Sequence, residues 1–333
     1  MKAFVIDRYD SKKAGRFAEI LEPKLKADDV LIKIDAASVN PLDLKIREGK
    51  LKFILPYRFP LILGSDLSGV VVAIGSSVQK FKVGDEVYAR TDRERTGAFA
   101  EFIAIKEAGV AKKPKGVTME EAAAIPLVGL TAWQVLVERA NLKKGQKVLI
   151  HAGSGGVGSF AIQLAKHLGA IVATTASTAN IDLVKHLGAD IVIDYKKENF
   201  EMLLQDYDLV LDTLGGEVLE KSFSVLKPGG QAISIAGPPD HHFAEKYKLS
   251  FMLKLLMWGL SYQIRRKAQK YQTSYSFLFM ESNGYQLAEL SSLIETGIIH
   301  PVIDQIFSFK EIPAALDYVA MGSAKGKVII KMG

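Results

Sequence analysis

Residues 147–168 read KVLIHAGSGGVGSFAIQLAKHL and decide the fold of this chain. An apolar, strand-like run at residues 147–151 leads directly into the turn GSGGVG, residues 153–158. A helical pattern over residues 159–168 follows the turn at once. A strand, a glycine turn and a helix in this order form the pyrophosphate site of dinucleotide-binding folds.

Each glycine of this turn has an expected role. Gly153 should allow the tight turn, Gly155 should let a phosphate approach the backbone, and Gly158 should let the helix pack closely on the strand. The unpaired N–H groups at the start of the helix would bind the phosphates. The stretch therefore predicts a nucleotide cofactor.

The rest of the chain divides into two patterns. From about residue 132, strands alternate with helices, which is typical of parallel βαβ units. Six strands are expected, at residues 147–151, 171–175, 191–194, 209–212, 231–236 and 274–280. They predict an α/β domain with a doubly wound, parallel six-stranded sheet of the Rossmann type.

Short β-like runs separated by Gly, Pro and Asp fill the first third of the chain, at residues 3–6, 30–36, 69–74, 86–89 and 97–105. The tail ends in a short strand that we expect to return to this earlier sheet. The predicted domains are 1–125 together with 282–333, and 126–281.

Composition excludes several classes of function. The 333 residues contain no cysteine, which excludes disulfides, thiolate nucleophiles and sulfur-ligated metals. The 43 basic and 37 acidic residues are interspersed, so nucleic-acid binding is not expected. The N-terminus MKAFVID lacks the apolar core of a signal peptide, and we expect a cytoplasmic protein.

The most apolar stretch, residues 249–260, is short for a membrane span and contains Lys254. It predicts a packed helix and no stable membrane insertion. The longer segment 240–273 is compatible with a roof over a substrate cleft, a dimer interface or a membrane surface.

The end of the second expected strand predicts which cofactor is bound. Residues 173–178 read ATTAST, with no acid where an NAD-preferring fold carries one for the ribose hydroxyls. A small hydroxyl residue leaves room for the 2′-phosphate, so Ser177 and Tyr195 should hold it and select NADPH. The alternative is that Ser177 is a helix N-cap.

Motifs spread over nearly the whole chain resemble the medium-chain dehydrogenase/reductase superfamily. They are SVNPLD at 38–43, GSD at 64–66 with Gly69, VGDEV at 83–87, residues 126–133 and the glycine turn. The resemblance implies a GroES-like β domain paired with a Rossmann domain, with substrate bound between them.

Within this superfamily, zinc alcohol dehydrogenases have Cys at the position of Asn40 and Gly-His-Glu at the position of Gly64-Ser65-Asp66. This chain lacks both kinds of ligand, so no metal is expected. The sequence is more similar to the zinc-independent quinone oxidoreductases, and to their enone and alkenal oxidoreductase subgroup, at residues 40–45, 193–195, 282–284 and 301–304.

That resemblance implies an NADPH-dependent oxidoreductase acting on quinones or on the C=C bond of enones and 2-alkenals. The implied cofactor-binding residues are Asn40, Lys45, Thr131, Gly153, Ser154, Gly155, Gly156, Val157, Gly158, Ser177, Tyr195, Leu214, Ala236, Gly237, Phe277 and Leu278.

No essential catalytic residue is evident, because the cofactor itself carries the difficult chemistry. Lys45 and Tyr57 are candidate donors to a developing enolate oxygen. Lys45 is equally compatible with a role as a surface cofactor clamp, and Tyr57 with a role as a wall of the site. A homodimer is expected to form through the edge strand at 274–280.

Two other functions fit parts of the sequence. Residues 152–156 approximate the nucleophile elbow of a serine hydrolase, with Ser154 as nucleophile and His300 as base. A catalytically silent NADPH-binding scaffold would retain the same fold without turnover.

Overall fold

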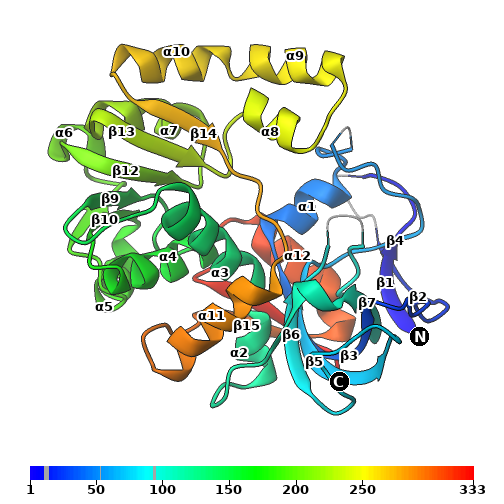
Figure 1. The fold of residues 1–333 in the computed structure, drawn as a ribbon. Coiled ribbons are helices and arrows are strands. Elements are labelled where there is room, and N and C mark those ends of the chain that lie inside the picture. The colour runs from blue at the N-terminus through cyan, green and yellow to red at the C-terminus, as the bar shows by residue number, and fades with distance from the viewer. Residues whose placement is uncertain (11–14, 53, 93–94) are drawn as a thin grey trace. The chain divides into compact units, whose positions relative to one another are not determined.

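Two units make up the chain in the computed structural model, which describes residues 1–10, 15–52, 54–92 and 95–333 (Figure 1). Unit 1 comprises Met1–Leu130 and Glu281–Gly333, and unit 2 comprises Thr131–Met280. Each unit encloses an apolar cluster of its own. Among the described residues, no helix is long and apolar enough to cross a membrane.

Unit 2 is built on a six-stranded sheet in the order β11-β10-β9-β12-β13-β14, and every residue of this unit is described. All neighbouring strands are parallel. The strands are β9 (Lys147–Ile150), β10 (Ile171–Ala176), β11 (Ile191–Asp194), β12 (Tyr207–Asp212), β13 (Leu226–Ser234) and β14 (Ser274–Phe277). The strand order reverses between β9 and β12, where such sheets bind ligands at their carboxyl ends. The predicted fold class is confirmed.

Helices join these strands. They are α4 (Gly156–His167), α5 (Ile181–His186), α6 (Phe200–Leu203), α7 (Gly216–Ser222), α8 (His241–Lys246), α9 (Phe251–Leu260) and α10 (Tyr262–Lys270), with a π-helix at Gln134–Arg139 and 3-10 turns at Thr178–Asn180 and Phe223–Val225. Helix α3 (Pro126–Trp133) contains the boundary between the units. Val148, Leu149 and Ile150 of the central strand are fully buried, which explains its uninterrupted apolar sequence.

Unit 1 contains, in its described part, a seven-stranded and a three-stranded sheet. The first comprises β3 (Asp29–Val39), β5 (Asp66–Ile74), β6 (Glu86–Arg90), β7 (Phe102–Lys106), β8 (Val110–Lys112), β15 (Ile303–Ser308) and β16 (Lys327–Lys331), and the second β1 (Lys2–Ile6), β2 (Arg16–Glu19) and β4 (Leu61–Ile62). Its helices are α1 (Pro41–Arg47), α2 (Met119–Ala123), α11 (Gly284–Glu295) and α12 (Ile312–Ala320), with 3-10 turns at Glu107–Gly109 and Phe309–Glu311. Strand β16 pairs antiparallel with β3, so the last strand of the chain joins an early one.

Several boundaries differ from the predicted ones. Strand β13 ends at Ser234, because the N–H groups of Ala236 and Gly237 donate to the Ser234 hydroxyl instead of to a strand. Strand β14 ends at Phe277, whose N–H donates to the Asp240 carboxylate. These polar side chains stop the strands earlier than the apolar pattern indicates.

Several elements also begin at residues other than the predicted ones, among them strands β12 and β13, helix α4 and strand β7. Helix α4 begins at Gly156, three residues early, because Gly155 is its N-cap and accepts from the Ser159 N–H at 2.9 Å. Strand β7 begins only at Phe102, because Ala100 forms an isolated bridge with Ala3.

Candidate functional site

The glycine turn of unit 2 is anchored to the neighbouring strand. The Gly153 N–H donates to the Thr175 carbonyl of β10 at 3.0 Å, and the Gly155 N–H donates to the Ala152 carbonyl at 3.0 Å. Ala152 itself has a φ of 52°, in the left-handed region. The chain therefore reverses sharply between β9 and α4.

The surroundings of the three glycines separate their roles. A Cβ on Gly153 would lie 2.1 Å from the Thr174 Oγ1, and one on Gly158 would lie 2.3 Å from the Ala152 carbonyl oxygen. A Cβ on Gly155 would meet only that same oxygen, at 3.4 Å. Gly153 and Gly158 are thus required by the packing of the protein, whereas the space beside Gly155 is open at the start of α4. This arrangement fits a bound pyrophosphate.

Ser177 and Tyr195 lie side by side at the carboxyl ends of β10 and β11. The parallel register pairs Ala176 with Asp194, and the Tyr195 N–H donates to the Ala176 carbonyl at 3.2 Å. Tyr195 is 59% exposed and Ser177 is half-buried. Ser177 occupies the N-cap position of the following 3-10 turn, but its side chain makes no capping hydrogen bond. The Ser177 hydroxyl therefore does not accept the backbone hydrogen bond that an N-cap role requires.

An acid that the sequence analysis did not single out lies next to this pair. Asp194 ends β11, and its carboxylate accepts from the Thr178 hydroxyl and from the Lys196 N–H, with the Lys197 ammonium 3.6 Å away. The hydrogen bond from Thr178 is the main reason that the pKa of Asp194 is lowered. Asp194 is therefore held by local partners, on the strand after the one where NAD-preferring folds carry their acid.

A second group missed by the sequence analysis shapes the neighbouring strand ends. The buried Asp212 carboxylate accepts from the Gly215 and Leu214 N–H groups and from the Ser234 hydroxyl. Ser234 in turn accepts from the N–H groups of Ala236 and Gly237. The available signal was a polar residue closing an apolar strand, in YDLVLD and QAIS.

The residues predicted to follow the ribose and nicotinamide share the same sheet edge. Leu214 follows β12, Ala236 and Gly237 follow β13, and Phe277 and Leu278 lie at the end of β14. The Leu278 N–H donates to the Ser234 carbonyl at 2.9 Å, which joins the last two strand ends. Thr131 is buried in α3.

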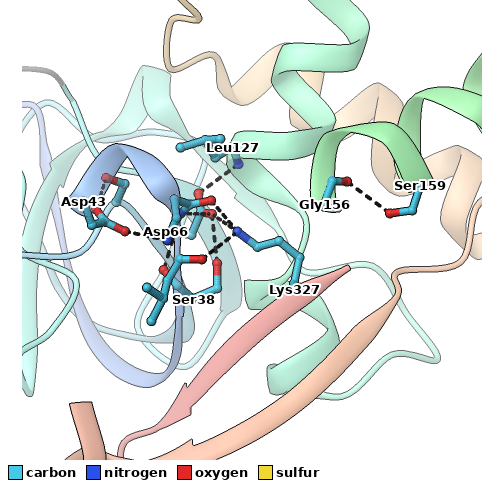
Figure 2. Close-up of polar contacts among 10 residues, drawn as sticks. Ser38, Asp43, Asp66, Leu127, Gly156, Ser159 and Lys327 are labelled. Carbon is cyan, nitrogen blue, oxygen red and sulfur yellow. Dashed lines mark hydrogen bonds and ion pairs between the residues drawn. The ribbon is translucent and has the colours of Figure 1, made fainter. Parts of the chain in front are cut away.

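Unit 1 contains a buried polar cluster around Asn40 and Asp66 (Figure 2). The Asn40 N–H donates to Asp43 Oδ2 at 2.8 Å, and Asn40 Nδ2 donates to Asp66 Oδ2 at 2.9 Å. The Ser65 hydroxyl donates to Asp43 Oδ1 at 2.7 Å. Burial raises the pKa of Asp43 to about 6. The two positions where zinc enzymes carry ligands are occupied here by side chains that hydrogen-bond within the protein.

The Lys327 ammonium completes this cluster. It lies 3.3 Å from Asp66 Oδ2 and donates to Asn40 Oδ1 (Figure 2). Asp66 Oδ1 accepts from the Leu127 N–H at 2.8 Å. Burial lowers the pKa of Lys327, while the neighbouring Asp66 and Asp43 act in the opposite direction. Among the described residues, no group of three or more His, Asp or Glu side chains is arranged to hold a metal.

The two candidate donors lie in different segments of unit 1. Lys45 is on the exposed side of α1, and Tyr57 is half-buried against the apolar core, where its N–H donates to the Tyr9 hydroxyl at 3.2 Å. Arg90 was not predicted from the sequence, and its buried guanidinium donates to the Thr91 carbonyl. Within the described part of the chain its Nε has no hydrogen-bond partner. Such a donor is available to a ligand oxygen.

The geometry of the turn does not favour the hydrolase alternative. In a nucleophile elbow the serine itself occupies the strained turn position. Here that position belongs to Ala152, and the Ser154 hydroxyl accepts from Asn180 Nδ2 at 3.0 Å.

Comparison with known proteins identifies two matching family models. Residues 26–115 match the alcohol dehydrogenase GroES-like domain, and residues 187–330 match a family described as zinc-binding dehydrogenase. The chain is 38% identical to the 2-methylene-furan-3-one reductase of Solanum lycopersicum, over 99% of this chain and 79% of that protein.

Two further relatives agree with this match. The NADPH-dependent alkenal/one oxidoreductase of Arabidopsis thaliana, a chloroplastic protein, is 36% identical over 99% of this chain and 79% of its own length. The solved structure of the quinone oxidoreductase from Coxiella burnetii superposes with a TM-score of 0.88, at 31% identity, over 100% of this chain and 99% of that one.

Proposed function

We propose that this chain, which belongs to the zinc-independent quinone oxidoreductase group of the medium-chain dehydrogenase/reductase superfamily, is an NADPH-dependent reductase of quinones or enones. The observation that carries the proposal is the open space beside Gly155 at the start of α4, with Ser177 and Tyr195 on the adjoining strand ends.

NADPH, when bound, would supply hydride to an electron-poor carbon of the acceptor. The protein would contribute binding and orientation. The N–H groups at the start of α4 would hold the pyrophosphate, and Ser177 with Tyr195 would hold the 2′-phosphate. The backbone segments fixed by Asp212 and Ser234 would position the ribose and nicotinamide.

The acceptor would be a quinone, or the C=C bond of an enone or 2-alkenal. In either case negative charge develops on an oxygen, which a fixed donor stabilises. Lys45 and Tyr57 remain the candidate donors, and Arg90 joins them because its buried Nε lacks a partner among the described residues.

Loss of NADPH absorbance in the presence of quinones, 2-alkenals or enones tests this activity, with simple alcohols plus NADP⁺ as the comparison. Turnover with the electrophilic acceptors and none with alcohols is expected. Ester cleavage without reductase activity would support the hydrolase instead. NADPH binding with no turnover of any acceptor would support the scaffold alternative.

Ser177→Asp tests the choice of cofactor. A carboxylate beside the 2′-phosphate adds like-charge repulsion, so the Kd for NADPH should rise at least about tenfold while that for NADH does not rise. Ser224→Asp is the matched control, because Ser224 is exposed in the turn after α7. Unchanged selectivity in Ser177→Asp would remove Ser177 from the phosphate site.

We further propose a homodimer formed through β14, the edge strand of the sheet, and a cytoplasmic location. An edge strand offers unpaired backbone groups that a second copy can extend across a two-fold axis. Light scattering in solution tests the dimer, and cell fractionation tests the location.

A further inference from the structure

The excess of basic over acidic residues arises in one segment, contrary to the expectation that the signs are interspersed. Residues 246–273, here called the basic segment, contain seven of the 43 Lys and Arg residues and none of the 37 Asp and Glu residues. The segment carries a charge of +7, and the 36 basic and 37 acidic residues of the rest of the chain nearly cancel, which leaves the net charge of +6. It contains helices α9 and α10, which follow one another along unit 2 (Figure 1).

Helix α9 exposes apolar side chains, so the prediction of a packed helix at 249–260 is wrong. Its exposed side chains are Phe251 (79%), Met252 (80%), Leu255 (59%), Leu256 (54%), Trp258 (47%) and Leu260 (57%). Only Met257 is buried. At 100° per residue these six side chains cover about half of the helix circumference, and none is charged. An apolar surface of this kind marks a site of interaction.

Cations and amphipathic rings flank this apolar face along the chain. Lys248, Arg266 and Lys270 are exposed, and no acidic side chain of the described residues pairs with them. The Arg265 guanidinium lies 5.3 Å from the centre of the Trp258 ring and donates to the Trp258 carbonyl at 2.9 Å. The Tyr262 ring lies 5.8 Å from that of Trp258. Trp, Tyr and basic residues beside an apolar helix face are typical of helices that lie at a membrane interface.

We propose that the basic segment binds the surface of an anionic lipid bilayer. Helix α9 lies in the plane of the membrane, with its apolar face at the boundary between headgroups and acyl chains. The Lys and Arg side chains contact the lipid phosphates. Hydrophobic burial and attraction to anionic headgroups act together in such binding.

Charge argues against a second copy of this chain as the occupant of the α9 face, which does not include the β14 edge proposed for the homodimer. In a two-fold symmetric interface the same patch faces itself, so the cations of one basic segment would face those of the other. No acidic residue lies between residues 246 and 273 to compensate them. An anionic membrane offers acyl chains to the apolar face and lipid phosphates to the cations.

Vesicle co-sedimentation of the full-length protein tests the proposal. Binding is expected to vesicles of phosphatidylcholine with phosphatidylglycerol, to be much weaker for phosphatidylcholine alone, and to fall with added salt. In a Trp133→Phe background the emission of Trp258 should shift to the blue with the anionic vesicles only. No binding, or equal binding to both kinds of vesicle, would overturn the proposal.

Paired variants separate the two contributions. Arg266→Gln with Lys270→Gln should weaken binding to anionic vesicles roughly fivefold for each cation removed. Leu255→Gln with Leu256→Gln should weaken it by at least about tenfold. The controls are Lys24→Gln with Lys310→Gln, and Leu21→Gln with Leu203→Gln, which replace exposed residues of the same kinds elsewhere.

These control variants should bind anionic vesicles as the unmodified protein does. They remove the same amount of charge or apolar surface, but outside the basic segment. If Leu255→Gln with Leu256→Gln instead abolished self-association in the absence of lipid, the face would be an interface between copies and the proposal would be wrong.

One consequence rests on the proposed quinone activity. A bilayer-bound reductase would meet long-chain quinones dissolved in the lipid, so Leu255→Gln with Leu256→Gln should slow their reduction in anionic vesicles but not that of a water-soluble quinone. Vesicle binding without turnover of either quinone would refute the activity and leave the membrane surface supported.

Discussion

At the residue scale, Lys327 and Asp66 form a buried ion pair in unit 1. The two residues are 261 positions apart in the chain, and their side chains are at most 5% exposed. Asp66 also accepts from Ser38, Asn40 and the Leu127 N–H. Removal of one partner of such a pair leaves an uncompensated buried charge, which is strongly destabilising.

We therefore expect Lys327→Met to lower the free energy of unfolding by about 3–5 kcal/mol, measured in urea. Adding Asp66→Asn should restore part of this loss, because the remaining charge is removed. Lys331→Met is the control on the same strand. Its salt bridge to Glu120 is at the surface, with Lys331 63% exposed, and its loss should change the free energy of unfolding little. Additive effects in the double variant would contradict this account.

At the element scale, the glycines between β9 and α4 of unit 2 have different surroundings and therefore different roles. Gly158 faces backbone atoms that cannot move, whereas Gly155 faces open space. The first is a requirement of the fold, and the second is available to a ligand.

Gly158→Ala should destabilise the protein by about 1–3 kcal/mol, because its Cβ would overlap the Ala152 carbonyl. Gly155→Ala should lower the Tm only slightly, since its φ of −78° suits alanine and only the N-cap preference for glycine is lost. It should nevertheless weaken NADPH binding at least about tenfold. Calorimetry and NADPH titration of both variants measure the two effects. Normal NADPH affinity in Gly155→Ala would show that the phosphate does not approach there.

At the scale of the whole molecule, the two units contain titrating groups with opposite responses to acid. Burial raises the pKa of Asp43 in unit 1 to about 6, and burial lowers the pKa of His151 in unit 2 to about 3. Between pH 4 and 6 folded unit 1 takes up a proton that the unfolded chain takes up only near pH 3.8, so acidification favours its folded state. Folded unit 2 excludes a proton that an unfolded histidine binds below about pH 6.5, so acidification disfavours it.

Hydrogen exchange monitored by mass spectrometry should therefore show protection falling first in unit 2 as the pH is lowered from 7 to 5. The contribution of His151 over that range is about 2 kcal/mol. His151→Gln removes the titrating ring, which accepts or donates at Thr175 and Ser222, and should flatten this response. Loss of protection first in unit 1, or an unchanged response in His151→Gln, would contradict the prediction.

Prediction from the sequence succeeded where the signal is local. The six strands of unit 2 were expected from apolar runs of four to seven residues, and a parallel, doubly wound sheet was expected from the βαβ pattern. It failed at strand ends decided by side chains such as Ser234 and Asp240, and at α9, whose apolar composition is the same whether the helix is packed or exposed. Asp212 and Arg90 were missed because the role of a polar residue at a strand end depends on hydrogen-bond partners that are distant in the sequence.

The sequence by itself determined the fold class, the strand, glycine turn and helix at 147–168, and the lack of cysteine ligands, because these depend on residue types at short, regular spacings. Only the tertiary structure decided that Lys327 reaches Asp66, that Ser177 lies beside Tyr195, and that the face of α9 is exposed. Those facts depend on strand register and on burial, which join residues far apart in the chain. The glycine turn depends on both sequence and tertiary structure. The order of residues predicts the site, and the packing shows which glycine leaves space for a ligand.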